Sequence, residues 1–190
     1  MMRRAWAAAA CVGLALPVGA HRVSDMLQTV FVRCEADRVE VEWVGLPGAT
    51  SSRALVRLLD QDADGKVADD ERERFARLVA SKVRARMDGR RLGPGPVEAS
   101  IPPIDMLRAG NVPVRLRWSL PVLAPTAGSH RAEVFNGFRA LDSVYLCGAV
   151  VPESPGVRVL GQERDRRQRR LTVRFDVEVP ASSLLPGPPP

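Results

Sequence analysis

The sequence contains few of the side chains that enzymes use for acid–base or nucleophilic chemistry. It has only two histidines among its 190 residues, His21 and His130. No nucleophile stands beside a base in a recognisable motif, no glycine-rich loop suits a phosphate, and no Cys/His cluster has zinc-binding spacing. Acid–base catalysis would therefore depend on carboxylates alone, and no carboxylate pair stands out beyond one acidic loop. We expect a protein that is not an enzyme.

Lysine is also scarce, and arginine supplies almost all of the positive charge. Lys66 and Lys82 are the only lysines, although Lys and Arg together number 28 and the formal net charge is +6. The arginines are densest in residues 162–170, where Glu163 and Asp165 interrupt them. Such a run suits either a phosphate or nucleic-acid contact or a solvated hairpin turn. The mixed charge and the lack of interleaved aromatic residues favour the turn, so we expect no nucleic-acid partner.

Long hydrophobic runs are absent after the first twenty residues. Residues 1–20 combine a basic head, an apolar run over 5–16 and small residues at 18–20, which is the pattern of a secretory signal peptide cut after Ala20. Cys11 leaves a lipoprotein signal as the alternative. The apolar run is shorter than the roughly 20 residues that span a bilayer. We therefore expect a periplasmic or secreted chain with no transmembrane segment after cleavage.

After that cleavage two cysteines would remain, Cys34 and Cys147, each within an expected strand. An oxidising compartment would allow them to pair. Spacing alone cannot place their Cα atoms at the separation that a disulfide needs. A disulfide and two buried free thiols both remain open.

Apolar and polar residues alternate along most of the chain, and Gly and Pro punctuate the alternation. Val39, Val41 and Trp43 alternate with Glu40 and Glu42, which predicts a half-buried strand. Short strands at regular spacing predict a mainly β (α+β) fold, an antiparallel β-sandwich over residues 21–180. Residues 181–190 form a Pro-rich tail that we expect to be disordered. The other strands are expected near residues 26–34, 97–101, 112–120, 132–135, 144–151, 157–162 and 171–179, with a short hairpin around 87–92.

The most specific motif is the acidic segment 60–71, which has the spacing of an EF-hand calcium loop. It places acidic residues at loop positions 1, 3, 5 and 12 and a glycine at position 6. Apolar residues at helical spacing flank it, so we expect an inserted helix–loop–helix over about residues 49–85. The alternative is an acidic, solvated turn between two helices. The predicted Ca²⁺ ligands are the side chains of Asp60, Asp62, Asp64 and Glu71 and the backbone carbonyl of Lys66.

The two histidines suggest a second, weaker metal site. His21 would become the first residue after cleavage, where the α-amine and the imidazole can chelate copper or nickel. His130 would complete the site if the fold brought it close. The alternative is an ordinary first residue and a histidine at the start of a strand, and the spacing does not favour a metal.

Three parts of the chain together resemble a family of exported bacterial domains. These are residues 21–28 (HRVSDMLQ), the calcium-type loop, and the SVYL segment at 143–146 followed by the Gln/Arg-rich turn at 162–168. They are similar to the extracytoplasmic part of membrane proteins of the nickel/cobalt transport and hydrogenase/urease accessory type. We therefore expect an exported EF-hand domain that binds calcium in a structural or interaction role. The resemblance implies the alternative, a soluble accessory of a membrane metal-ion transport system.

Overall fold

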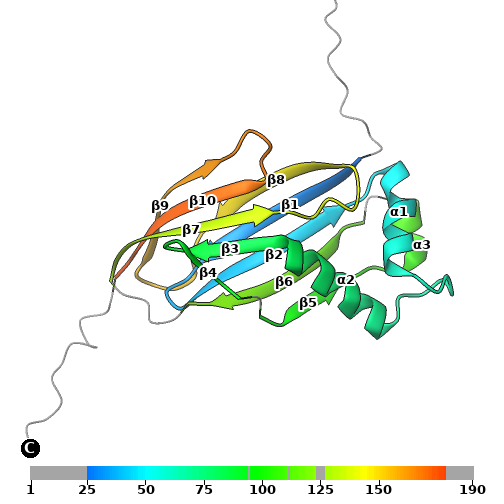
Figure 1. Ribbon diagram of the computed structural model, residues 1–190, viewed down its shortest axis with the longest axis horizontal. Coiled ribbons are helices and arrows are strands. Elements are labelled where there is room, and N and C mark those ends of the chain that lie inside the picture. Colours follow the sequence, from blue (N-terminus) through cyan, green and yellow to red (C-terminus); the bar gives the residue numbers. More distant parts are fainter. Residues whose placement is uncertain (1–24, 94, 111, 123–126, 179–190) are drawn as a thin grey trace, which may run out of the picture.

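The computed structural model describes residues 25–93, 95–110, 112–122 and 127–178 (Figure 1). The expected signal peptide, His21 and the Pro-rich tail at 181–190 lie outside these residues. None of the helices within the described residues is long and apolar enough to cross a membrane.

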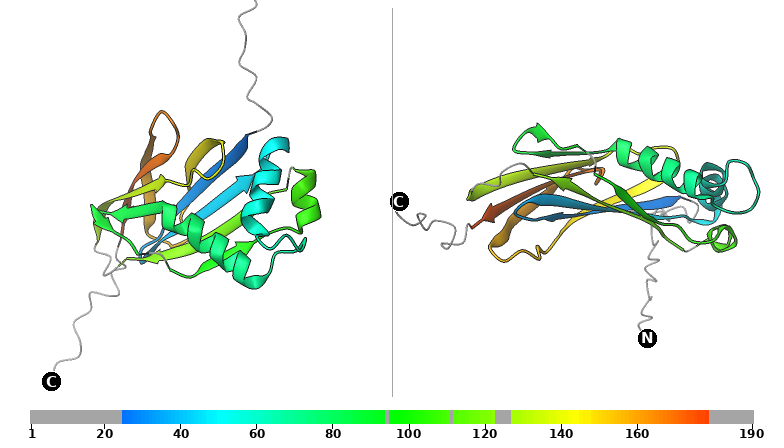
Figure 2. Two further views of the ribbon diagram at one scale, coloured as in Figure 1. Left: turned by 45° about the vertical axis from the view of Figure 1, so that its right-hand side comes forward. Right: turned by 90° about the horizontal axis from the view of Figure 1, so that it is seen from below.

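Two five-stranded sheets form most of the fold, which confirms that the chain is mainly β. Both sheets and the helices contribute to one hydrophobic core, and Figure 2 shows the sheets in two further views. Across sheet one the order is β5 (Val97–Ser100), β6 (Val114–Pro121), β2 (Arg38–Leu46), β1 (Met26–Cys34) and β8 (Ser143–Val150). Across sheet two the order is β4 (Arg90–Arg91), β3 (Val83–Met87), β7 (Gly128–Asn136), β10 (Arg170–Val177) and β9 (Val157–Arg164).

The strand pairing differs from the expected antiparallel arrangement at one place. β1 and β8 run parallel, with Val30 opposite Cys147. The chain leaves sheet one after β6, forms β7 in sheet two, and returns to sheet one as β8. β8 begins beside the start of β1, where Met26 N donates to Asp142 O at 3.0 Å. This register puts Cys147 beside Val30 and not beside Cys34. Both cysteines are buried free thiols, and burial raises the pKa of Cys34 to about 12.

The helices occupy the link between β2 and β3 and a short connection after β5. α1 (Ala49–Leu59) and α2 (Asp69–Lys82) form where the helix–loop–helix was expected. The expected end near residue 85 was wrong, because buried Val83, Ala85 and Met87 alternate with exposed arginines and form β3. α3 (Ile104–Ala109) was not predicted, and it lies beside α1 at one end of the molecule (Figures 1 and 2).

Three aromatic rings hold α2 against both sheets. Trp43 on β2, Phe75 on α2 and Phe138 after β7 pack edge to face, with ring centroids 5.8–6.2 Å apart. All three side chains are almost fully buried. Edge-to-face packing adds to the free energy that burial of such rings already provides. The middle of α2, one turn beyond the end of the acidic loop, is therefore fixed to the core.

The arginine-rich segment forms the hairpin turn that its mixed charge favoured. β9 ends at Arg164 and β10 begins at Arg170, and the two strands pair antiparallel. Asp165 closes the turn, since its Oδ1 accepts hydrogen bonds from Arg169 N at 2.7 Å and from Arg170 N at 3.0 Å. The backbone of the turn is thus held by a carboxylate from within the turn.

Candidate metal centre

The acidic loop begins where α1 ends and finishes in the first turn of α2. Asp60 is the C-terminal cap of α1, and its N–H still donates to Val56 O at 2.8 Å. The chain then bends sharply through two residues with positive φ, Ala63 at 62° and Gly65 at 85°. Glycine adopts this conformation without steric cost, which explains its place at the sixth position. The bend returns the chain to Glu71, the third residue of α2.

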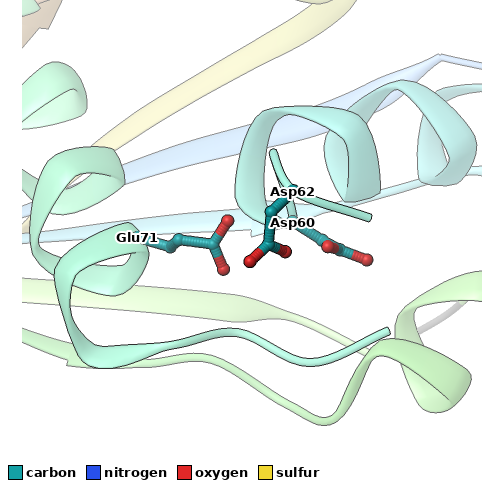
Figure 3. A group of neighbouring side chains, drawn as sticks. All are labelled: Asp60, Asp62 and Glu71. Atoms are coloured by element: carbon teal, nitrogen blue, oxygen red, sulfur yellow. The ribbon is translucent and has the colours of Figure 1, made fainter. Parts of the chain in front are cut away.

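Three of the four predicted carboxylates converge in this loop. One oxygen from each of Asp60, Asp62 and Glu71 lies within 4.8 Å of the other two. Figure 3 shows Glu71 reaching from α2 towards the two aspartates at the end of α1. Asp60 and Glu71 are buried, whereas Asp62 is exposed. Within the described part of the chain this is the only such group of His, Cys, Asp and Glu side chains.

Asp60 has one oxygen that the protein leaves unsatisfied. Its Oδ2 accepts a hydrogen bond from Gly65 N at 3.2 Å. Its Oδ1 is buried and has no hydrogen-bond partner among the described residues. Buried polar atoms almost always have a partner in folded proteins, so this atom requires an explanation. A cation between the carboxylates would satisfy it, and the residues present fit such an ion.

Glu71 is held in place through both of its oxygens. Oε1 accepts from Gln61 N at 2.6 Å, and Oε2 accepts from Ala68 N at 3.1 Å. The Gln61 amide, with those of Ala68 and Asp62 and the nearby Arg74, lowers the pKa of Glu71, although burial acts in the opposite direction. An ionised carboxylate offers about four lone-pair positions, so two amides leave room for an ion. The side chain is therefore charged, oriented and still able to ligate.

The fourth predicted carboxylate, that of Asp64, lies apart from the converging group. The Asp64 carboxylate is exposed, and its Oδ1 accepts from Lys66 N at 2.8 Å. Asp62 Oδ1 likewise accepts from Asp64 N at 3.1 Å. The Lys66 side chain is exposed, as expected for a residue that would contribute only its carbonyl. The loop backbone is thus curled around its own carboxylates.

Sequence reasoning did not include Arg74, whose guanidinium lies 3.6 Å from Glu71 Oε1. The available signal was its spacing of three residues from Glu71 on a helix, which puts the two side chains on one face. Arg74 offsets part of the negative charge in the loop.

His130 lies in a separate environment on β7. Its Nδ1 is 2.8 Å from Asp88 Oδ2, and Asp88 Oδ1 accepts from Arg131 N at 2.8 Å. Its ring is 5.8 Å from that of Phe175. Burial acts to raise the pKa of Asp88, but the contacts with His130 and the Arg131 amide outweigh it and lower the pKa. The structure brings His130 together with Asp88, and its predicted partner His21 lies outside the described residues.

No family model, curated protein or solved structure matches the chain.

Proposed function

We propose that the two sheets form a β-sandwich and that α1, the acidic loop and α2 form an EF-hand inserted in it. In this proposal the protein is an exported Ca²⁺-binding domain with a structural or interaction role, and it is not an enzyme. The ion is held by the carboxylates of Asp60, Asp62, Asp64 and Glu71 and by the Lys66 carbonyl. The signal-type pattern of residues 1–20 supports a periplasmic or secreted location.

The observation that carries the proposal is the buried, unpartnered Oδ1 of Asp60. Asp60 belongs to the group of three carboxylates, and its Oδ1 has no partner among the described residues, whereas its other oxygen and both oxygens of Glu71 accept backbone hydrogen bonds. An acidic, solvated turn would not need to bury a carboxylate oxygen without a partner. A bound cation would supply the partner that this oxygen lacks among the described residues.

The donor set favours calcium over other ions. Every proposed ligand is an oxygen, which suits hard cations and not the softer transition metals. Calcium accepts roughly 6–8 oxygens in flexible geometry, whereas magnesium demands near-ideal octahedral geometry and keeps several waters. Ala68, at the ninth loop position, has no side-chain oxygen to offer the ion. Residues 61–66 and Ala68 are exposed, so a water molecule can act as the ligand there. A single exported hand is expected to bind with a Kd of about 10⁻⁴–10⁻³ M.

Calcium is expected to stabilise the domain modestly. At a free calcium concentration ten times the Kd, binding to the folded state alone adds about 1.4 kcal/mol to the free energy of unfolding. Val67, at the eighth loop position, packs partly buried against the core of this chain. The loop is therefore coupled to the core without a second hand.

Calorimetric titration with CaCl₂ tests the proposal. The wild-type protein should release or absorb heat with one site per chain, and Glu71→Gln should abolish the signal. Glu73→Gln is the matched control, because Glu73 is exposed on the same helix and its salt-bridge partner among the described residues is Arg77, at 2.8 Å. The absence of heat with the wild type, or equal heat with Glu71→Gln, would refute calcium binding at this loop.

A second candidate is an accessory role in nickel- or cobalt-type transport. The sequence resemblance supports it, and so does the Asp88 carboxylate at Nδ1 of His130. Metal-bound histidines usually place their second ring nitrogen against a carboxylate or carbonyl in this way. Titration with NiCl₂ should then give a signal that His130→Ala removes and Glu71→Gln leaves intact. Retention of the nickel signal in His130→Ala would exclude this histidine.

A further inference from the structure

A basic pocket is lined by residues of the β7–β8 connection, the start of β8 and the β9–β10 turn. Four arginines line it: Arg139 from the β7–β8 connection and Arg166, Arg167 and Arg169 from the turn. Its volume of about 490 Å³ falls within the roughly 300–1,000 Å³ typical of small-molecule sites. No acidic side chain is among the described residues that line it. The pocket is open to solvent, and it gathers positive charge at one place on the surface.

The central arginine of this pocket is buried. Only 5% of Arg169 is exposed, and its guanidinium lies 4.8 Å from the centre of the Tyr145 ring and 5.0 Å from that of Phe135. Its Nε is buried and has no hydrogen-bond partner among the described residues. Burial is the main effect that lowers the pKa of Arg169, and the positive charges of Arg139 and Arg167 act in the same direction. Asp165 acts in the opposite direction, and the Phe135 and Tyr145 rings contact the guanidinium, so the fold buries this cation beside two aromatic rings.

The arginines of the pocket also lack a carboxylate in direct contact among the described residues. Among the described residues, none of the four forms a salt bridge with a carboxylate, whereas arginines on the sheet faces do: Arg115 and Arg117 both contact Glu42 at 3.1 Å. Asp165 is the nearest acidic residue in the turn, and its Oδ1 is used by the turn backbone. Such an arrangement favours an anion with more than one negative charge, which would replace the missing carboxylates.

We propose that this pocket binds a phosphate group, as free phosphate, a phosphomonoester or a phospholipid headgroup. Guanidinium groups match the oxygens of phosphate with paired hydrogen bonds, and several of them can share one dianion. Ser143 and Tyr145 also line the pocket, but their hydroxyls donate to the backbone carbonyls of Leu141 and Phe138, so the arginines are the proposed donors to the phosphate. The nearby aromatic rings are not free to stack on the bases of a nucleic acid. Arg169 already covers the Tyr145 ring, and Arg84, Arg169 and Arg170 lie over the Phe135 ring.

The experiment is a titration of the full chain with inorganic phosphate at constant ionic strength, in chloride buffer. Arg139→Gln/Arg167→Gln should weaken binding at least about tenfold, since each lost charge-assisted hydrogen bond is worth about that factor. Arg115→Gln/Arg117→Gln is the control, because it removes the same charge from exposed positions on sheet one and should bind as the wild type does. All four substituted arginines are exposed, so both double variants should fold. Arg169→Gln, which changes the buried arginine, should also weaken phosphate binding, and its urea midpoint shows whether it folds.

Flotation with vesicles of phosphatidic acid, a phosphomonoester lipid, in phosphatidylcholine distinguishes the two sources of the phosphate. Vesicle binding that Arg139→Gln/Arg167→Gln abolishes assigns the pocket to a headgroup, and phosphate binding without vesicle binding assigns it to a soluble ligand. The proposal fails if the wild type binds neither probe. It also fails if the control variant loses as much affinity as the pocket variant, because the effect would then be net charge alone.

Discussion

Replacement of Gln28 by leucine should strongly destabilise the fold, although an apolar residue would suit the alternating pattern of this strand. Gln28 is fully buried on β1 and joins the two sheets. Its Oε1 accepts from Trp43 Nε1 at 3.1 Å and from Asn136 Nδ2 at 2.9 Å, and its Nε2 donates to Ser143 Oγ at 2.8 Å. Leucine has a similar volume but leaves the donors of Trp43 and Asn136 without an acceptor. Each buried, unsatisfied donor costs about 1–3 kcal/mol, so the free energy of unfolding should fall by about 2–6 kcal/mol.

Urea denaturation followed by tryptophan fluorescence measures this change. The m-value should stay constant, because the surface exposed on unfolding is almost the same in the two proteins. Thr29→Val is the control, since Thr29 is the next residue on β1 and faces away from the core; its effect should lie within about 0.5 kcal/mol. A loss below about 1 kcal/mol for Gln28→Leu would refute the argument that this network stabilises the sheet pair.

Three further predictions concern buried charged and thiol groups. Asp60→Asn should abolish the rise in melting temperature that CaCl₂ causes. Without calcium this variant should be at least as stable as the wild type, because a buried charge is removed. Scanning fluorimetry measures both, and a melting temperature that still rises with CaCl₂ would contradict the prediction. Glu35 is 1% exposed and accepts two backbone amides of the β8–β9 connection at 2.8 Å each, so Glu35→Gln should cost about 1–3 kcal/mol at neutral pH. Burial acts to raise the pKa of Glu35, but these bonds outweigh it and lower the pKa. The extra free energy of unfolding of the wild type over Glu35→Gln should therefore be complete above about pH 4.3 and disappear as the pH falls through the lowered pKa. Urea titrations at each pH measure it. Cys34 and Cys147 should both resist a thiol reagent in the native protein and react after unfolding, and fast reaction of Cys34 in the native state would contradict its burial.

The sequence predicted local structure well where one side-chain period dominates. Trp43 and its alternating neighbours indicated β2, and the acidic spacing indicated the loop that brings Asp60 and Glu71 together. Periodicity identifies which face of a strand is buried, but it does not identify the neighbouring strand. The parallel pairing of β1 with β8 depends on the path of the chain between sheets, which no local pattern records.

Other features escaped prediction because they depend on contacts far apart in the sequence. α3 is only six residues long, and Ile104 and Leu107 are its only buried residues. Such a short apolar pattern after two prolines is equally compatible with a loop. Gln28 and Arg169 are polar residues, which are usually exposed, and only the fold shows that both are buried.

A high-resolution crystal structure of the protein grown with CaCl₂ would show whether the acidic loop holds calcium. We expect one ion within about 2.3–2.6 Å of Asp60 Oδ1 and of both Glu71 carboxylate oxygens. An ordered loop with no ion there, or an ion that Asp60 Oδ1 does not contact, would contradict it.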